Sequence, residues 1–112
     1  MKLRFAPSPT GLLHVGNARL AIANALYARK HGGQFQLRID DTDTARSRED
    51  LADAIRQDLS WLGVRWDETF RQSERLARYA RAMEALKESG RLYPCFESEQ
   101  ELAAKRETQI RQ

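Results

Sequence analysis

The first third of the chain combines three local signals that together leave few possible folds. Residues 2–6 are followed at once by Pro7 and Pro9, which lack the N–H group that a sheet needs, so a strand is predicted over 2–6 that ends there. Small and apolar residues at 15–30 precede a pair of glycines and predict a helix with a glycine C-cap. Apolar and polar residues alternate at 34–39 and predict a second strand. A strand, a helix and a strand in so short a span form a βαβ unit, with parallel strands and a right-handed crossover.

Helical patterns follow this unit. Ser47 and Asp50 resemble a capping box with Asp in place of Glu, and they predict a helix that stops at Gly63. The apolar face of that helix consists of Leu51, Ile55, Leu59 and Leu62. Another helix is predicted over 73–89, with a core-forming stripe of Leu76, Tyr79, Ala80, Met83 and Leu86.

The last part of the chain adds a short predicted strand at 92–96 and a helix that a capping box of Ser98 and Glu101 opens. The whole pattern predicts an α/β fold: the first half of a Rossmann-like doubly wound parallel sheet, with no sign of the second half. A single βαβ unit leaves sheet edge and face uncovered. We therefore expect the chain to be incomplete, a fragment of a larger protein.

Composition narrows the class of protein. A chain of 112 residues with 41% hydrophobic and 31% charged residues fits one small globular domain. Residues 1–48 carry a net charge of +5 and residues 49–112 carry −2, which either favours an anionic ligand near the start or reflects ordinary scatter of surface charge. Cys95 is the only cysteine, so an intrachain disulfide is excluded. No apolar run is long enough for a signal peptide or a membrane span, and a cytoplasmic protein is expected.

The junction between the first strand and the first helix is suited to an anion. A helix N-terminus offers unpaired N–H groups and the positive end of the helix dipole to a phosphate. His14 can donate to a phosphate oxygen whose charge grows in a transition state, and Gly16 lets a base or ribose approach the backbone; alternatively, His14 is a cap or a packed residue. The dinucleotide fingerprint Gly-x-Gly-x-x-Gly and the P-loop Gly-Lys-Ser/Thr are absent, which disfavours NAD-dependent and Walker-type functions.

A longer run crosses this junction and reads Arg4-Phe5-Ala6-Pro7-Ser8-Pro9-Thr10-Gly11-Leu12-Leu13-His14-Val15-Gly16-Asn17. This run resembles the "HIGH" region of glutamyl-tRNA synthetases, class I enzymes whose fourth motif position is often not histidine; here that position is Asn17. The resemblance covers nearly the whole chain, because it continues through His31-Gly32-Gly33, Arg38-Ile39-Asp40-Asp41-Thr42-Asp43, Trp61-Leu62-Gly63, Gln72-Ser73-Glu74-Arg75 and Leu92-Tyr93-Pro94-Cys95-Phe96.

This resemblance implies a glutamate-tRNA ligase that acts in two steps. L-Glutamate attacks the α-phosphate of ATP to give glutamyl-adenylate and pyrophosphate, and the glutamyl group then moves to the 3′ end of tRNA(Glu). Residues 1–90 are expected to be the N-terminal part of the Rossmann-like catalytic domain, and 91–112 the start of an inserted acceptor-binding subdomain, truncated. The lysine-bearing "KMSKS" loop of the family has no counterpart here, so the chain alone is expected to be inactive.

The motif positions imply an ATP site at the start of the first helix. His14, Gly16 and Asn17 are the expected catalytic residues, and with Thr10 they are expected to bind ATP. The first step asks for charge stabilisation around a phosphoryl group and little covalent help, which a helix N-terminus and a histidine can supply.

The resemblance also implies a glutamate site, made by Arg4, Ser8 and Asp40. Arg4 would pair with a substrate carboxylate, although an arginine at a strand end also fits an ordinary surface residue. Asp40 matches the position that binds the α-amino group, where Glu is common in the family. Because Asp is one methylene shorter, the amino group must move closer or a water must bridge. Asp40, Asp41 and Asp43 also fit turn and cap residues after a strand.

Expectations about metals follow from the same segments. Mg²⁺ is expected with ATP and would rest largely on the phosphates, so no metal-binding residues of the chain are assigned. Some family members bind zinc through a Cys-x-Cys pair near Cys95, but no second cysteine is present and zinc is not expected. Cys95 is expected to be a small buried residue.

Two other functions remain open at this stage. A glutamyl-queuosine tRNA(Asp) synthetase shares the motif region, and a non-catalytic fragment or binding module would need none of it. No membrane partner is expected, and the sequence predicts neither the oligomeric state nor whether tRNA(Gln) is also charged. The uncovered sheet edge makes self-association possible.

Overall fold

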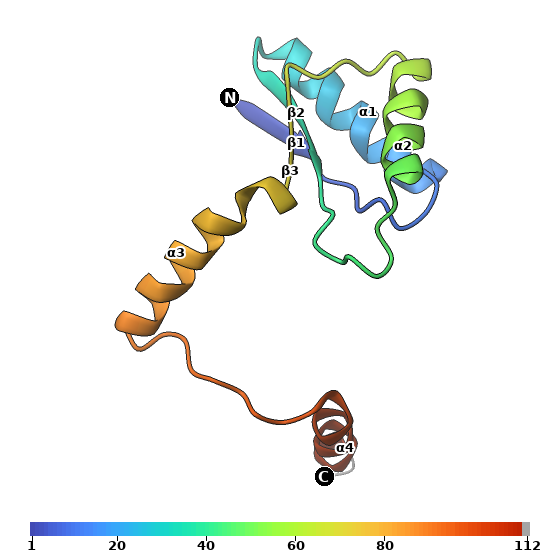
Figure 1. Cartoon of the computed structure of the whole chain (residues 1–112). Helices are drawn as coiled ribbons and strands as arrows, with labels where there is room; N and C mark the ends of the chain where they lie inside the picture. The colour runs from blue at the N-terminus through green and yellow to red at the C-terminus, as the bar shows by residue number, and fades with distance from the viewer. Residues whose placement is uncertain (111–112) are drawn as a thin grey trace. The chain divides into compact units, whose positions relative to one another are not determined.

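The computed structural model describes residues 1–110, and its packing divides the chain into two compact units, Met1–Leu76 and the segment from Ala77 onward. The elements in chain order are β1 (Lys2–Phe5), α1 (Val15–Lys30), β2 (Gln34–Ile39), α2 (Glu49–Trp61), β3 (Glu68–Arg71), the 3-10 turn η1 (Ser73–Arg75), α3 (Leu76–Glu88) and α4 (Glu99–Ile110). The strands belong to the first unit, which has the predicted α/β fold (Figure 1). The division that the sequence predicts near residue 90 concerns domain identity and stays a prediction.

The sheet of the first unit is entirely parallel, with the strand order β1-β2-β3. Because successive strands are added in one direction, right-handed crossovers put α1 and α2 on the same face of the sheet, as Figure 1 shows. The register pairs Arg4 with Gln36 and Gln36 with Glu68, so these polar residues share one face. Phe5 pairs with Leu37 on the face that the helices cover.

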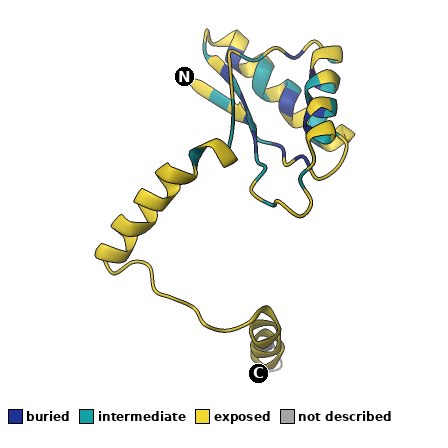
Figure 2. Ribbon diagram, viewed as in Figure 1, coloured by how far each residue is buried: buried dark blue, intermediate teal, exposed yellow. Residues whose placement is uncertain are grey.

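The core lies between the sheet and these two helices (Figure 2). Helix α1 contributes Ala21 and Ala28, whose small side chains let the helix backbone approach the strands closely. Helix α2 buries Ile55 and Leu59, two of its predicted apolar residues. The hydrophobic core cluster consists of Phe5, Ala21, Ala28, Phe35, Leu37, Ile39, Ala52, Ile55, Leu59 and Val64, and each large side chain among them contributes roughly 1.5–3 kcal/mol by leaving water.

Glycines end both helices of the first unit at the predicted places. Gly32 adopts a φ of 59°, and the N–H of Gly33 donates to the carbonyl of Ala28 at 2.8 Å. Gly63 adopts a φ of 72°, and the N–H of Val64 donates to the carbonyl of Leu59 at 2.9 Å. These are Schellman motifs, in which only glycine adopts the left-handed conformation without strain.

The structure corrects three local predictions. Strand β3 (Glu68–Arg71) was not expected, so the first unit holds two successive βαβ units instead of one. The described residues 92–96 form no strand. The capping box of Ser47 and Asp50 does not form: Arg48 is the N-cap of α2 and makes no side-chain cap, because Asp50 pairs with Arg48 instead.

The second unit confirms one prediction and contradicts two. Ser98 and Glu101 form the predicted capping box at α4, with Ser98 N–H donating to Glu101 Oε2 at 2.7 Å and Glu101 N–H donating to Ser98 Oγ at 3.3 Å. The apolar stripe of α3 is exposed, with Tyr79 41% and Met83 44% accessible, so it forms no core in the described residues. Cys95 is exposed and not buried, and its thiol donates to Glu97 Oε2 at 3.1 Å.

Candidate functional site

The loop from β1 to α1 alternates between side chains that point inward and outward. Pro7 and Pro9 are buried, whereas Ser8 and Thr10 are exposed. The prolines bring no N–H group into the interior, and their carbonyls accept hydrogen bonds from Asp40 N–H at 2.9 Å and from the N–H of Arg48 at 3.1 Å. The Pro-Ser-Pro-Thr order therefore ties the loop to β2 and α2 and leaves both hydroxyls on the outer surface.

His14 is the N-cap of α1. Its backbone is extended, and its Nδ1 accepts a hydrogen bond from Gly16 N–H at 3.2 Å. A neutral imidazole carries one N–H, so a histidine that accepts at Nδ1 donates from Nε2. Gly16 lies directly against the ring, because a Cβ atom at this position would be 3.0 Å from His14 Cε1 and 3.1 Å from His14 Nδ1. Both motif residues thus set the orientation of one exposed imidazole.

Two adjoining grooves collect most of the predicted site residues. The first has a volume of about 500 Å³ and is lined by Arg4, among others. The second has a volume of about 230 Å³ and is lined by His14. Ser8, Thr10 and Asn17 line both grooves, so a single ligand could contact the end of β1 and the start of α1 together.

Asp40 lies one residue beyond β2, next to the same loop. Its N–H binds the carbonyl of Pro7, and its carboxylate accepts two hydrogen bonds from Arg38, at 2.6 Å from Nε and 2.8 Å from an Nη atom. Asp40 lines neither of the two grooves. The structure therefore brings together Arg4, Ser8, Thr10, His14 and Asn17, supports His14 on Gly16, and places Asp40 beside them through the backbone of Pro7.

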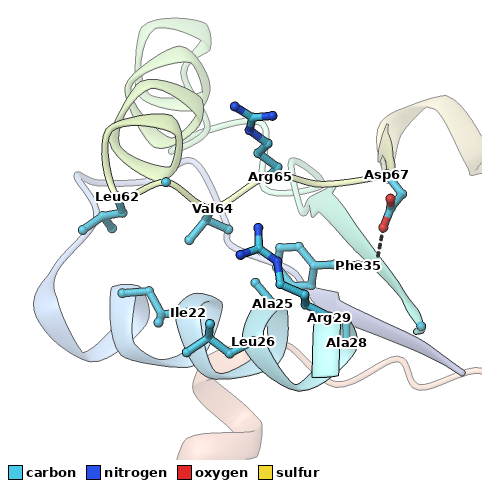
Figure 3. Close-up of a pocket in the computed structure, with 12 residues that line it drawn as sticks. Ile22, Ala25, Leu26, Ala28, Arg29, Phe35, Leu62, Val64, Arg65 and Asp67 are labelled. Atoms are coloured by element: carbon cyan, nitrogen blue, oxygen red, sulfur yellow. Dashed lines mark hydrogen bonds between the residues drawn. The ribbon is translucent and has the colours of Figure 1, made fainter. Parts of the chain in front are cut away.

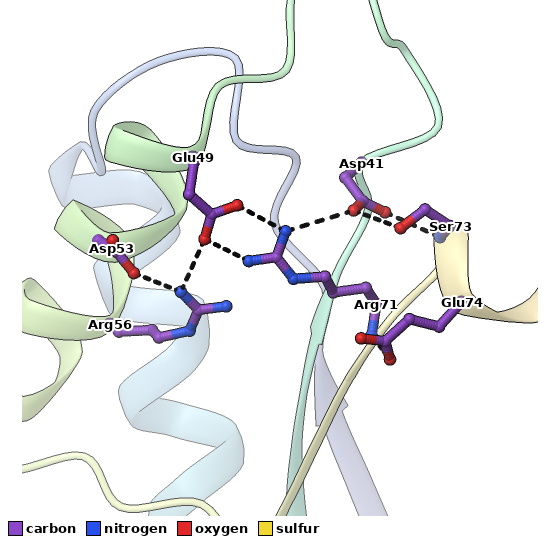
Figure 4. A network of polar contacts seen from close by, with 7 residues as sticks. All are labelled: Asp41, Glu49, Asp53, Arg56, Arg71, Ser73 and Glu74. Carbon is purple, nitrogen blue, oxygen red and sulfur yellow. Dashed lines mark hydrogen bonds and ion pairs between the residues drawn. The ribbon is translucent and has the colours of Figure 1, made fainter.

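A polar network at the carboxyl end of β3 anchors the acidic loop that follows β2 (Figure 4). Asp41 accepts hydrogen bonds from Ser73 N–H at 2.9 Å and from Ser73 Oγ at 2.7 Å, and Arg71 lies 3.8 Å away. Burial raises the pKa of the Asp41 carboxyl, but these hydrogen bonds and the Arg71 charge outweigh it, so the pKa lies below its ordinary value. Asp41 is therefore a structural anion, held between β2 and η1.

Arg71 extends this network to α2. Its guanidinium pairs with both carboxylate oxygens of Glu49, and Glu49 also lies 3.7 Å from Arg56 (Figure 4). The hydrogen bonds that Arg71 donates to Glu49 lower the pKa of the Glu49 carboxyl and raise the pKa of Arg71. Because Glu49 is in the first turn of α2, the pair also suits the helix dipole. Asp43 accepts from the N–H of Arg46 and has the predicted role in the turn.

A separate groove of about 290 Å³ lies between α1 and the connection from α2 to β3 (Figure 3). Apolar residues such as Ile22 and Leu26 form much of its wall, and Arg29 and Arg65 also line it. Asp67 closes one end by accepting the N–H of Phe35 at 2.7 Å. No predicted site residue lines this groove.

Comparison with known proteins settles the family. The model for the catalytic domain of class I tRNA synthetases (E and Q) matches residues 1–112. The chain belongs to this family. The class I synthetase chain is 78% identical to "Glutamate--tRNA ligase 2" of Gluconacetobacter diazotrophicus and 69% identical to that of Gluconobacter oxydans, over 99% of its own length and 25% of theirs. It therefore spans about a quarter of the relatives that it matches.

Solved structures agree with this assignment. A glutamate tRNA ligase from Elizabethkingia meningosepticum, in complex with its amino acid, has a TM-score of 0.86 and 39% identity, over 96% of this class I synthetase chain and 23% of that one. Glutamate-tRNA synthetase from Elizabethkingia anophelis has a TM-score of 0.87 with the same identity and coverage. The α/β fold predicted from the sequence is thus confirmed as the beginning of a class I synthetase catalytic domain.

Sequence reasoning missed two features near this site. The first is the pairing of Arg38 with Asp40, for which the spacing of two residues on a strand is a signal, because such residues share a face. The second is the network of Arg71, Glu49 and Asp41, which joins segments far apart in sequence. Among the described residues, no three His, Cys, Asp or Glu side chains are arranged to hold a metal ion. None of the helices described is long and apolar enough to cross a membrane.

Proposed function

We propose that this chain carries one half of the adenylate-forming site of a glutamate-tRNA ligase, an enzyme that activates L-glutamate with ATP and transfers it to the 3′ end of tRNA(Glu). The observation that supports it most is the convergence of Arg4, Ser8, Thr10, His14 and Asn17 on two grooves that share three of these residues. The names of the relatives at 78% and 69% identity point to the same reaction. No observation favours the glutamyl-queuosine alternative.

In this proposal the second groove takes ATP. His14 donates from Nε2 to an oxygen of the α-phosphate, where negative charge increases as the glutamate carboxylate attacks. Thr10 and Asn17 add neutral hydrogen-bond donors, and the N-terminus of α1 adds its positive dipole. The first turn of α1 contains no acidic residue that would repel the phosphates. These groups position the phosphate and stabilise charge without forming a covalent intermediate with the protein.

The first groove and the adjacent end of β2 take glutamate. Arg4 pairs with a carboxylate of the substrate through the two parallel hydrogen bonds that a guanidinium provides. Ser8 supplies a hydroxyl, and Asp40 accepts from the α-ammonium group. The substrate carries charges of both signs, and the proposed residues place an opposite charge next to each of them.

Mg²⁺ accompanies ATP in this proposal. The ion would be held largely by phosphate oxygens and water. The ion supplies charge neutralisation of the phosphates when it is bound. Since the tRNA substrate is used in translation, we expect the protein to act in the cytoplasm.

Glutamate-dependent exchange of radioactive pyrophosphate into ATP tests the proposal in the full-length gene product that contains this chain. We expect exchange that requires glutamate and that falls about 100- to 1000-fold in kcat in His14→Ala. Charging of tRNA(Glu) should fall in parallel. Exchange that does not depend on glutamate, or transfer of glutamate to queuosine-modified tRNA(Asp) instead of the tRNA 3′ end, would overturn it.

A further inference from the structure

The side chain of Asp40 is held before any substrate arrives. Arg38 Nε lies 2.6 Å from Asp40 Oδ1, and an Arg38 Nη atom lies 2.8 Å from Asp40 Oδ2. Both side chains are largely covered, with 18% of Arg38 and 25% of Asp40 exposed. This is the bidentate arrangement of a guanidinium and a carboxylate, which fixes the plane of the carboxylate as well as its position.

The backbone geometry explains why the pair forms. Arg38 lies near the end of β2, and residues two apart along an extended chain point to the same face. A long arginine can therefore reach forward to the short aspartate. The N–H of Asp40 is fixed by the carbonyl of Pro7 at 2.9 Å, so the backbone and the side chain of Asp40 are both restrained.

The pair leaves binding capacity on the carboxylate. Two carboxylate oxygens provide about four lone-pair sites, and the fork of Arg38 takes one on each oxygen. An ammonium group can approach the remaining sites. Without Arg38, a short aspartate would sample several rotamers and would need to be ordered on binding, which weakens the affinity for substrate.

We propose that Arg38 is a positioning residue for glutamate, which orients the Asp40 carboxylate toward the α-ammonium group of the substrate. The inference rests on the proposed function and adds to it a residue that touches neither substrate. It also accounts for how the shorter aspartate can serve where the family commonly has glutamate: its carboxylate is fixed by Arg38 instead of reaching freely.

Pyrophosphate exchange in the full-length gene product separates this role from a structural one. In Arg38→Met we expect the KM for glutamate to rise about 10- to 100-fold, because a displacement of about 1 Å has effects of this size, while the KM for ATP stays within about twofold. The KM for glutamate of Arg38→Lys should lie between those of the unsubstituted protein and Arg38→Met, since lysine keeps the positive charge but cannot form the bidentate pair. Lys2→Met is the matched control, because it removes another ion pair of the same sheet face, with Glu68 at 2.7 Å, and should leave both KM values unchanged.

A double-mutant cycle tests whether Arg38 acts through Asp40. In an Asp40→Asn background, Arg38→Met should produce no further rise in the KM for glutamate, because the carboxylate that it orients is gone. Three results would overturn the inference and leave the proposed function standing: an unchanged KM for glutamate in Arg38→Met, an equal rise in the KM for ATP, or a full additional rise in the Asp40→Asn background. Absence of glutamate-dependent exchange in the unsubstituted protein would overturn the proposed function, and the inference with it.

Discussion

Replacing Gly16 with alanine should separate the stability of α1 from its catalytic use. The added Cβ would lie 3.0 Å from His14 Cε1 and 3.1 Å from His14 Nδ1. Carbon atoms in favourable contact are about 3.5–4.0 Å apart, so the imidazole must move by roughly half an ångström or more. That movement breaks or lengthens the 3.2 Å hydrogen bond from Gly16 N–H, and it turns Nε2 away from its position.

The two consequences differ in size. Alanine favours a helix over glycine by about 0.5–1 kcal/mol, and the lost side-chain cap costs about 0.5–2 kcal/mol, so the free energy of unfolding should change by only about 1 kcal/mol. Loss of one aligned donor to a developing phosphate charge costs about 100- to 1000-fold in kcat. A nearly normal thermal unfolding curve should therefore accompany a severe loss of glutamate-dependent pyrophosphate exchange.

Exchange assays and thermal denaturation of Gly16→Ala, His14→Ala and the double variant check this reasoning. If Gly16→Ala acts by displacing the imidazole, the double variant should be no less active than His14→Ala. Normal exchange by Gly16→Ala would refute the assignment of His14 as a donor held by Gly16. An additional loss in the double variant would show that Gly16 acts on ATP independently of the imidazole.

Three further predictions concern other parts of the first unit. The pKa of Asp41 in the folded protein lies below its ordinary value of 3.8, so the ionised carboxylate stabilises the fold at pH values above 3.8, and this contribution is lost as the pH falls through the folded-state pKa. Asp41→Asn should therefore be less stable to urea than the unsubstituted protein at pH 7, and the difference should be smaller near pH 3. Gly33→Ala should lower the free energy of unfolding by about 1–3 kcal/mol in urea titrations, because its Cβ would lie 2.7 Å from the Met1 carbonyl oxygen; a neutral result would show that β1 shifts freely. Arg4→Lys should raise the KM for glutamate about tenfold and spare that for ATP in the exchange assay, since lysine cannot form two parallel hydrogen bonds, and an unchanged KM would remove Arg4 from the site.

The first βαβ unit could be predicted almost to the residue because each boundary has a local cause. Prolines end β1, Schellman glycines end α1, and strict alternation marks β2. Strand β3 has no such signal, because it is only 4 residues long and mostly polar. None of its residues is fully buried. Its pairing with β2 depends on long-range packing of α2, which no short window of sequence contains.

The two predicted capping boxes also show that tertiary contacts can override a local sequence pattern. Ser98 and Glu101 form the motif because glutamate reaches back to the N-cap backbone. Asp50 is one methylene shorter and pairs with Arg48, while the N–H of Arg48 donates to the carbonyl of Pro9. The start of α2 is thus fixed by the loop that follows β1, a tertiary contact that overrides the local pattern.

The position of the candidate site could be predicted from the motif, but its charge arrangement depends on the sheet. A parallel sheet is usually covered on both faces and apolar on both. Here the face opposite α1 and α2 carries Arg4, Gln36, Arg38 and Glu68, which the register places in neighbouring rows. The Lys2–Glu68 and Arg38–Asp40 pairs neutralise part of this face.

Arg4 takes part in none of the ion pairs found among the described side chains, and it lines the groove at the end of β1. A substrate with charges of both signs needs one accessible cation and one oriented anion, and in the proposed glutamate site these are Arg4 and Asp40. Both residues could be predicted from the sequence, but the ion pairs of the neighbouring charged residues could be seen only from the register of the three strands. The motif therefore predicts which residues to test, and the fold is needed to explain how Arg38 holds the short Asp40 side chain in place.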